Sequence, residues 1–190
     1  MMRDEHLIET CAASKSVFEG KILHVYVDDI NLPNGAKGFR EYIKHIGAVA
    51  VLPLTNDGKV ICVRQYRYAV GEVTTEIPAG KLDSPDEDPR EAALRELREE
   101  TGARCKELTY LGTYLASPAI LDEKINLYLA RGLDFGDTDP DDDEFIDVVH
   151  VPLDEMVDRV MRGGILDGKT QLAVLKVSEL LRREKTEKES

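Results

Sequence analysis

The amino-acid sequence predicts a protein of the α/β class, and three patterns support this prediction. Residues 17–70 alternate apolar and polar positions between turn signals, which is typical of four or five strands. Residues 46–54 are almost continuously apolar, as in a central strand that is buried on both faces. Beyond residue 88, helical patterns alternate with further strands, which is consistent with a sheet covered by helices.

Two tight turns are expected within the strand region, at Leu32–Gly35 and at Asn56–Gly58. A proline in the first turn fixes φ, and asparagine and glycine accept the positive φ that a reversal of the chain requires. Both segments therefore predict hairpins between neighbouring strands.

A helix is expected between Asp88 and Gly102. The side chain of Asp88 can cap the first turn, Pro89 suits the first helical position, and Glu91 completes an arrangement like a capping box. Gly102 is a typical residue to end a helix, because glycine readily adopts a left-handed conformation.

The remaining elements follow from the same patterns. Further strands are expected near residues 108–115, 125–131 and 145–151, and helices at 153–162 and 168–184. The tail EKTEKES is expected to fray. We find no internal repeat, and no linker is expected to divide the chain into independently folding domains.

The composition of the 190 residues, 42% hydrophobic and 33% charged, is that of a globular protein. No apolar run is long enough to span a bilayer. The first residues are acidic and lack the apolar core of a secretory signal, which predicts a cytoplasmic protein. Cys11, Cys62 and Cys105 are an odd number without CxxC spacing, so free thiols are expected rather than disulfides or a zinc site.

The net charge of −12 argues against binding to nucleic acid or to a membrane surface, because phosphate groups attract basic surfaces. An acidic protein that acts on phosphates needs a counter-charge. A hard divalent cation such as Mg²⁺ would supply it.

Three glutamates in the predicted helix carry the most informative pattern. On a helical projection from residue 88, Glu96, Glu99 and Glu100 form a stripe beside the apolar stripe that includes Leu97. This spacing brings the carboxylates within reach of one another, where like charges repel unless something neutralises them. Carboxylate oxygens are the donors that Mg²⁺ and Mn²⁺ prefer, so the stripe predicts a metal site.

The alternative interpretation is a solvated acidic helix face, which is common in glutamate-rich helices. Two observations favour the metal site. Glu91, Arg95 and Arg98 lie on the outer face and are expected to pair with one another, which leaves the inner acids outside that surface lattice. Gly80, before the helix, allows the backbone to approach and a carbonyl group to point into a site.

The stretch from Gly80 to Ala103 resembles the Nudix box, GX5EX7REUXEEXGU, in which U is aliphatic. The second half, from Arg95 onward, fits position by position. In the first half, Gly80 and Glu87 are separated by six residues rather than five, and the additional residue falls in a loop, where insertions are tolerated. The chain is therefore identified as similar to the Nudix hydrolases.

This resemblance implies a Nudix-type α/β/α sandwich around a mixed sheet, with a small N-terminal antiparallel β appendage. Residues 1–44 would form this N-terminal β-segment, and residues 45–190 would form the catalytic domain. Similar proteins commonly exchange the N-terminal segment between two subunits. A homodimer is therefore expected, with residues 1–44 as the dimerisation segment.

The resemblance also assigns roles within the box. Glu96 and Glu100 would be the main metal ligands, Glu99 a catalytic residue and a ligand to a further metal, and the Ala79 carbonyl a backbone ligand. Mg²⁺ is the expected cofactor, and Mn²⁺ is the alternative. The residues with a structural role in the motif would be Gly80, Glu87, Gly102 and Arg95, which would orient the glutamates.

Outside the box, the chain is similar to the ADP-ribose pyrophosphatase branch of the family. The matching segments include Arg64–Arg67, Glu76–Leu82 and Ser117–Glu123. A proline at the position of Pro118, downstream of the box, marks ADP-ribose as the substrate in this branch. Taken alone, the same proline is equally consistent with a simple loop turn.

Three more residues are candidates for binding a small-molecule nucleotide-sugar substrate. Guanidinium groups match phosphate oxygens, so Arg40 and Arg67 are expected at the diphosphate or the terminal ribose phosphate, although each is alternatively a surface arginine. Phe18 is a candidate for stacking on adenine and is alternatively a core residue. If subunits exchange the N-terminal segment, Arg40 and Phe18 would serve the partner's site.

Glu144 ends an acidic run that precedes the strand expected at 145–151. In similar proteins an acid in this loop activates water or completes the metal shell, whereas the alternative is a solvated loop. The implied reaction is attack of water on one phosphorus of ADP-ribose, giving AMP and ribose 5-phosphate. The alternatives are a pyrophosphatase for GDP-mannose or ADP-glucose, a non-catalytic nucleotide-binding module of Nudix fold, and an acidic scaffold.

Overall fold

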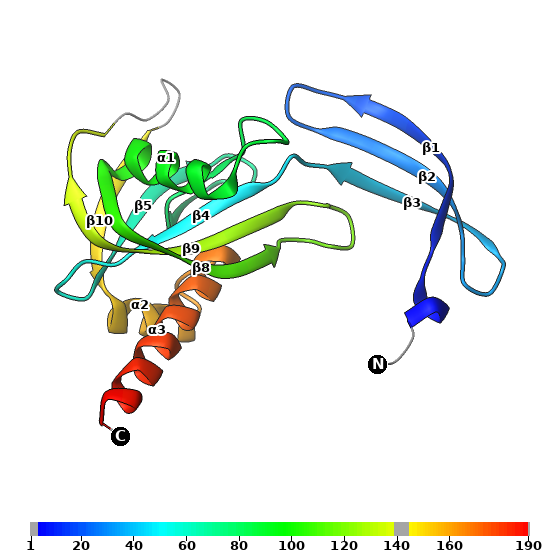
Figure 1. Ribbon diagram of the computed structural model, residues 1–190. Helices are drawn as coiled ribbons and strands as arrows, with labels where there is room; N and C mark the ends of the chain where they lie inside the picture. The colour runs from blue at the N-terminus through cyan, green and yellow to red at the C-terminus, as the bar shows by residue number, and fades with distance from the viewer. Residues whose placement is uncertain (1–3, 139–144, 190) are drawn as a thin grey trace. The chain divides into compact units, whose positions relative to one another are not determined.

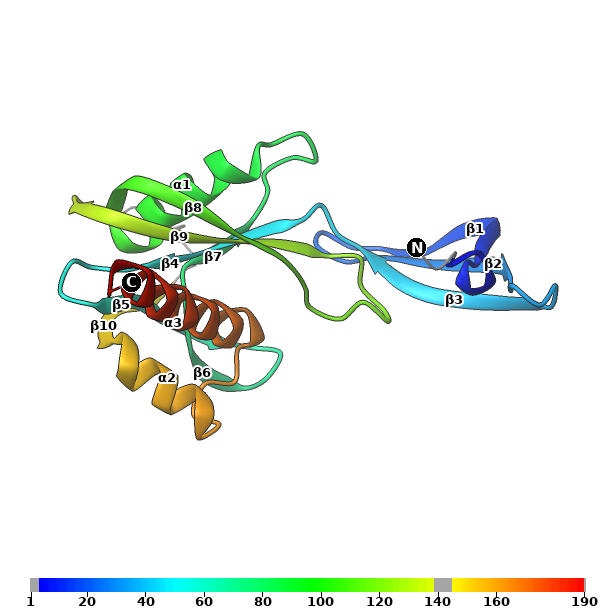
Figure 2. The same cartoon turned by 60° about the horizontal axis from the view of Figure 1, so that its bottom comes forward.

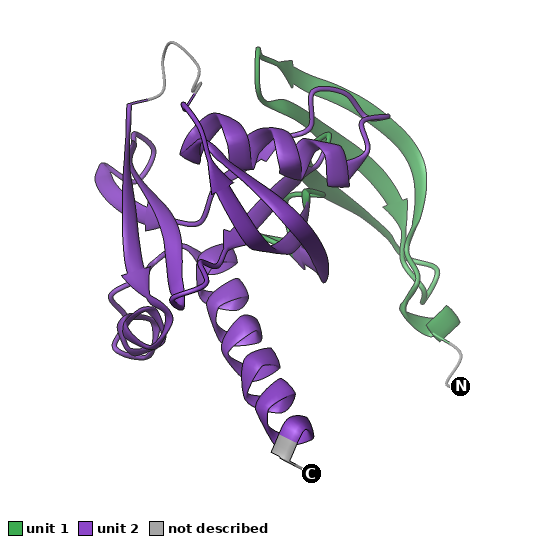
Figure 3. Cartoon of the chain, turned by 60° about the vertical axis from the view of Figure 1, so that its left-hand side comes forward, with its two compact units in different colours: residues 1–46, 115–124 green, residues 47–114, 125–190 purple. Residues whose placement is uncertain are grey.

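The computed structural model describes residues 4–138 and 145–189 and divides the chain into two compact units. The first unit contains residues 1–46 and 115–124, and the second contains residues 47–114 and 125–190 (Figure 3). The segment 115–124 therefore belongs with the N-terminal residues, although it lies far from them in the sequence.

The N-terminal unit is a three-stranded antiparallel sheet in the order β1-β2-β3, which confirms the predicted β appendage. A short 3₁₀ helix, η1, precedes the sheet, and the elements are η1 (Asp4–Leu7), β1 (Thr10–Glu19), β2 (His24–Asn31) and β3 (Lys37–Lys44). Strand β1 begins before the predicted position 17, and all its residues are exposed. Gly35, at φ 84°, closes the predicted turn between β2 and β3. Leu121 pairs with Ile43 of β3, which attaches the segment 115–124 to this sheet.

The second unit contains a mixed four-stranded sheet in the order β7-β4-β9-β8. Strand β7 is antiparallel to β4, whereas β9 is parallel to β4. The bounds are β4 (Ala48–Pro53), β7 (Ala79–Lys81), β8 (Ala103–Leu115) and β9 (Lys124–Phe135). Every residue of β4 is buried, which confirms the central strand that the apolar run predicts.

A separate antiparallel sheet has the order β10-β5-β6. Its strands are β5 (Lys59–Arg67), β6 (Glu72–Glu76) and β10 (Ile146–Pro152). Gly58, at φ 80°, closes the predicted turn before β5. Strands β6 and β7 were not expected from the sequence, because both are short and partly polar, and pairing with β5 and β4 decides their conformation.

Helices cover both faces of the mixed sheet, as the alternation along β4 requires. The helices are α1 (Pro89–Thr101), α2 (Leu153–Met161) and α3 (Gly168–Glu189). Val49 and Val51 of β4 pack in one cluster with Leu97 of α1, and Ala50 and Leu52 pack in another cluster with α2 and α3. Two views show α1 and α3 on opposite sides of the sheet (Figures 1 and 2). This arrangement confirms the α/β/α sandwich.

Helix α3 continues to Glu189, beyond the predicted end at residue 184. Ion pairs stabilise the helix up to residue 184: Arg131 of β9 donates to Glu184 at 2.9 Å, and Arg182 and Arg183 both bind Glu179. Within residues 4–138 and 145–189, no helix is long and apolar enough to cross a membrane.

Candidate active site

Helix α1 begins and ends where its sequence predicts. The Asp88 carboxylate accepts a hydrogen bond from the Arg90 backbone N–H at 2.8 Å, and Pro89 takes the first helical position. Gly102, at φ 67°, adopts the left-handed conformation at the C-terminus and donates its N–H to the Arg98 carbonyl at 2.8 Å. These two caps fix where the helix begins and ends, and the packing of Leu97 against β4 sets which side chains border the core.

The three predicted acids lie along the border between the core and the solvent. Leu97 is fully buried against the sheet, and Glu100 is only 2% exposed. The side chains of Glu96 and Glu99 are 12% and 25% exposed. Buried carboxylates are costly unless they are hydrogen-bonded or bind cations, so these side chains need specific partners.

Glu100 and Glu96 both contact the start of strand β7. The Ala79 backbone N–H donates to Oε2 of Glu100 at 3.1 Å. The carboxylate of Glu96 lies against Gly80, where an added Cβ would come within 2.0 Å of its Oε1. Only glycine leaves room for this carboxylate, so the role predicted for residue 80 has a direct steric basis.

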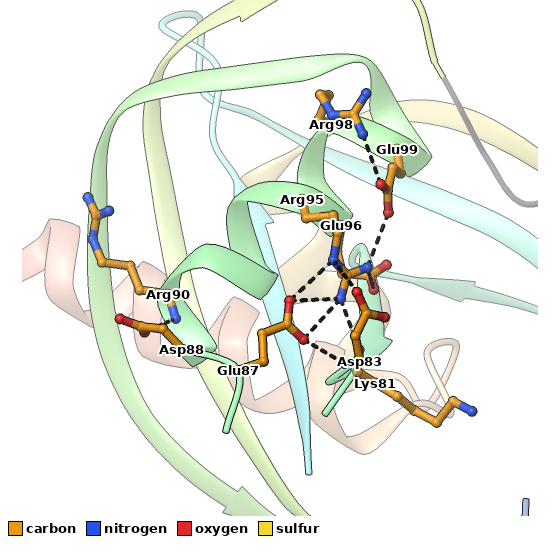
Figure 4. Close-up of polar contacts among 9 residues, drawn as sticks. All are labelled: Lys81, Asp83, Glu87, Asp88, Arg90, Arg95, Glu96, Arg98 and Glu99. Atoms are coloured by element: carbon orange, nitrogen blue, oxygen red, sulfur yellow. Dashed lines mark hydrogen bonds and ion pairs between the residues drawn. The ribbon is translucent and has the colours of Figure 1, made fainter. Parts of the chain in front are cut away.

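Arg95 is the centre of a charged network rather than a member of an outer lattice (Figure 4). Its Nη1 donates to Glu96 at 2.7 Å and to Glu99 at 3.2 Å. Burial opposes its charge, but hydrogen bonds to Glu87 and the charge of Glu96 outweigh this and raise the pKa of Arg95. Arg95 therefore neutralises and orients two of the acids, and the predicted pairing of Glu91, Arg95 and Arg98 among themselves is wrong.

Glu87 connects the loop that precedes α1 to this network. It accepts a hydrogen bond from the Asp83 backbone N–H at 2.5 Å, and lies 3.4 Å from Arg95. The Asp83 N–H and Arg95 lower the pKa of Glu87. A turn closed by the Glu87 N–H and the Ser84 carbonyl, at 3.2 Å, accommodates the additional loop residue.

Arg67 does not project freely from its strand. It donates two hydrogen bonds of 2.7 Å to the carboxylate of Glu76 on the neighbouring strand β6, and 41% of its side chain is exposed. The hydrogen bonds to Glu76 are the main reason that the pKa of Arg67 is raised. Burial alone would raise the pKa of Glu76, but Arg67 and Lys169 outweigh it and lower this pKa to about 2.

The start of α3 completes this cluster, which the sequence did not predict. Lys169 donates to Glu76 at 2.5 Å and to Asp167 at 2.9 Å. The fully buried Thr170 hydroxyl donates to Asp167 and accepts the Ile77 backbone N–H at 2.9 Å. No local signal identifies these partners, because Lys169 and Glu76 are separated by 93 residues.

A family model decides the classification of the chain. The model of the NUDIX domain matches residues 44–167, which is more than half of the chain. The chain belongs to the Nudix family. The Nudix-type fold predicted from the box and the assignment as a Nudix hydrolase are thereby confirmed.

Similar proteins are found along nearly the whole length of this Nudix chain. A methanol dehydrogenase activator of Bacillus methanolicus is 42% identical and covers 92% of this chain and 96% of its own. An ADP-ribose pyrophosphatase of Bacillus subtilis (strain 168) is 40% identical and covers 94% and 98%. The crystal structure of an ADP compounds hydrolase has a TM-score of 0.81 at 25% identity, covering 93% and 95%.

Nudix hydrolases generally need divalent metal ions, so the donor set of this site can be tested against such an ion. Among residues 4–138 and 145–189, no group of three or more His, Cys, Asp or Glu side chains lies so that it could hold a metal ion, so Glu96, Glu99 and Glu100 do not form such a group. Mg²⁺ does not require one, because it binds one or two carboxylates and completes its shell with water and substrate phosphates. The hard oxygens of Glu96 and Glu100 fit this requirement.

The other predicted substrate contacts belong to the N-terminal unit. Arg40 is half exposed, forms an ion pair with Glu9 and donates to the Phe39 carbonyl at 2.9 Å. Phe18 is 55% exposed in β1, and Pro118 lies in the turn of the segment 115–124. The remaining candidate, Glu144, lies outside the described residues.

Proposed function

We propose that this Nudix hydrolase cleaves the pyrophosphate of ADP-ribose, giving AMP and ribose 5-phosphate, with Mg²⁺ or alternatively Mn²⁺ as its cofactor. The observation that carries the proposal is the pair of inward acids, Glu100 on the Ala79 N–H and Glu96 against Gly80. The substrate is supported by the B. subtilis relative, whose name states this activity and which covers almost the whole chain.

Each acid of α1 has a separate role in this proposal. Glu96 and Glu100 would hold the cation together with the Ala79 carbonyl, and Glu99 would hold a further cation or act on the attacking water. A bound cation supplies Lewis acidity and lowers the pKa of water. Arg95 orients Glu96 and Glu99, because it donates a hydrogen bond to each. Glu144 is the second proposed catalytic acid.

Arg67 is proposed to hold the diphosphate. Its bidentate bond to Glu76 fixes the guanidinium plane, and the exposed part of the side chain remains available to phosphate oxygens. Because the Arg67 guanidinium is already held in place, less side-chain entropy is lost when the substrate binds. Arg40, Phe18 and Pro118 are proposed substrate contacts on the strength of the family resemblance.

The N-terminal unit is proposed as the dimerisation segment. Strand β1 is an exposed edge strand, and its unpaired backbone groups are a template for pairing with a second chain. Val17 and Phe18 on β1 and Phe39 on β3 expose large apolar side chains. Light scattering should give twice the mass of the chain, and a monomer would contradict this part of the proposal.

The B. methanolicus relative favours a second candidate function, activation of a methanol dehydrogenase. Its identity is as high as that of the pyrophosphatase, so the sequence comparison alone does not separate the two names. Adding the protein to an alcohol dehydrogenase assay, with the E100Q variant as control, tests whether any activation depends on the Nudix acids.

The deciding experiment is release of AMP from ADP-ribose, compared with ADP-glucose, GDP-mannose and diadenosine polyphosphates, in Mg²⁺, Mn²⁺ and EDTA. Rapid metal-dependent release from ADP-ribose is expected. Preferred cleavage of another compound would retain the chemistry and exclude this substrate. No cleavage of any compound would favour a nucleotide-binding module.

A further inference from the structure

Five consecutive residues, Glu76 to Gly80, connect the start of α3 to the acids of α1. Glu76 binds Lys169, and the Ile77 N–H binds the Thr170 hydroxyl. At the other end, Ala79 donates to Glu100, and Gly80 contacts Glu96. We propose that Lys169 and Thr170 are positioning residues for the metal-site acids and act through this segment, an inference that rests on the metal site of the proposed function.

The attachment to α3 is directional. Thr170 is fully buried, and its hydroxyl both donates to Asp167 and accepts the Ile77 N–H at 2.9 Å. The Thr170 N–H also donates to Asp167, at 2.9 Å, as in a helix N-cap. Because the hydroxyl donates its proton to Asp167, its lone pairs accept the Ile77 N–H. The start of α3 therefore sets the position of the Ile77 backbone.

The ion pair between Lys169 and Glu76 restrains the residue before Ile77. Glu76 is 3% exposed and accepts hydrogen bonds from Arg67, Lys169 and Thr74. All these bonds end on one carboxylate, which cannot rotate without breaking several of them. Residues 76 and 77 are thus fixed by different groups of the same helix turn.

The restraint continues to the acids through the backbone. The Pro78 carbonyl accepts the Val51 N–H at 2.9 Å, which connects the segment to the central strand β4. Ala79 and Gly80 pair with Ala50 and Val49. A shift of the segment would therefore move the Ala79 N–H that holds Glu100 and the Gly80 backbone against which Glu96 lies, and partners of this outer type commonly tune metal affinity.

A purely stabilising role would not require this arrangement. Buried ion pairs often contribute no more to stability than well-packed apolar residues of similar volume. Replacing Thr170 by valine keeps the side-chain shape and removes both hydrogen bonds of the hydroxyl, to Asp167 and from Ile77. A change in metal affinity, beyond a change in stability, then shows that Thr170 positions the site.

Binding of Mn²⁺ alone, followed by electron paramagnetic resonance, tests the inference without substrate. T170V is expected to weaken Mn²⁺ binding by about tenfold, the lower end of the range for groups that hydrogen-bond directly to metal ligands, because Thr170 acts through the backbone. T170S keeps the hydroxyl and should remain within about twofold of the wild type. K169M, which retains Thr170, should also weaken binding, and it decides the question if T170V does not fold.

Thr55 offers a matched control, because its hydroxyl accepts the Lys59 backbone N–H at the same 2.9 Å in a turn outside the segment. T55V should lower the melting temperature without changing Mn²⁺ affinity. In turnover assays, T170V should raise the Mg²⁺ concentration for half-maximal activity and leave KM for the nucleotide unchanged at saturating Mg²⁺.

Wild-type Mn²⁺ affinity in both T170V and K169M would overturn the inference, whichever nucleotide is cleaved. Mn²⁺ affinity that is unchanged in E100Q would overturn the proposed metal site itself, and the inference with it. A wrong substrate assignment affects neither result, because the measurement contains no nucleotide.

Discussion

The carboxylate of Glu96 occupies the space that a side chain on residue 80 would fill. An ideal Cβ on Gly80 would lie 2.0 Å from Oε1, 2.1 Å from Cδ and 2.4 Å from Oε2 of Glu96. The φ of Gly80 is not positive, so alanine can adopt its backbone conformation. Residue 80 is thus restricted to glycine by the position of one functional group, and this leads to the first prediction.

G80A should remove activity while leaving the fold largely intact. The clash falls on the flexible end of Glu96, which can rotate away, so the melting temperature should fall by less than about 4 °C, equivalent to about 1 kcal/mol. The displaced carboxylate should lower kcat by about 100-fold or more, the scale of losing one charge-stabilising group. G38A is the control, because its Cβ would make only ordinary contacts, the nearest at 3.5 Å. Full activity in G80A would refute the placement of Glu96 in the site.

E100Q should abolish turnover without unfolding the protein. Glutamine keeps the shape of Glu100, and its amide oxygen can still accept the Ala79 N–H. The lost charge should lower kcat by about 100-fold or more. The matched change E107Q, at an exposed position on β8, should leave kcat unchanged. Substantial residual activity in E100Q would contradict its assignment as a metal ligand.

G102A should destabilise the protein by more than φ strain alone explains. Gly102 has φ 67°, and a Cβ there would lie 2.3 Å from the Gly136 backbone carbonyl oxygen. Gly163 has a similar φ of 75° with nothing within 4 Å of the added Cβ, so G163A isolates the strain, about 1 kcal/mol. Urea denaturation should show G102A losing at least about 1 kcal/mol more than G163A, whereas equal losses would argue against a close approach of residues 102 and 136.

The ion pairs of Glu76 with Arg67 and Lys169 should make the stability of the protein fall in acid below about pH 4.5. The folded-state pKa of Glu76, about 2, lies below its usual 4.5, so its stabilising contribution is complete above pH 4.5 and is lost as the pH falls toward 2. The difference corresponds to about 3 kcal/mol. E76Q should therefore be less stable at pH 7, and its disadvantage should shrink in acid.

Urea midpoints of the wild type and E76Q between pH 7 and pH 2.5 measure this effect. E179Q is the control, because Glu179 also has a pKa lowered to about 2, by hydrogen bonds from Arg182 and Arg183, but its side chain is 42% exposed. Solvent screens such surface pairs, so E179Q should follow the wild-type curve. Parallel curves for the wild type and E76Q would show that Glu76 does not titrate with folding.

The sequence by itself determined the features that depend only on residues close together along the chain. Asp88 and Gly102 bound α1 because capping uses side chains and φ values of the cap residues themselves. The positive φ of Gly35 and Gly58 follows from glycine's lack of a Cβ. Helical periodicity then places Glu96, Glu99 and Glu100 on one edge of α1, and this periodicity is a local property of the chain.

Only the tertiary structure decided which partners these residues have. Arg95 has an outward position in the helical projection, yet it binds Glu87 and Glu96, because the loop before α1 folds back onto the helix. Arg67 faces Glu76 through the pairing of β5 with β6, and Lys169 reaches the same carboxylate from another part of the chain. Sheet pairing and helix packing bring together residues whose separation carries no periodic signal, so the network behind the metal site emerges only from the fold.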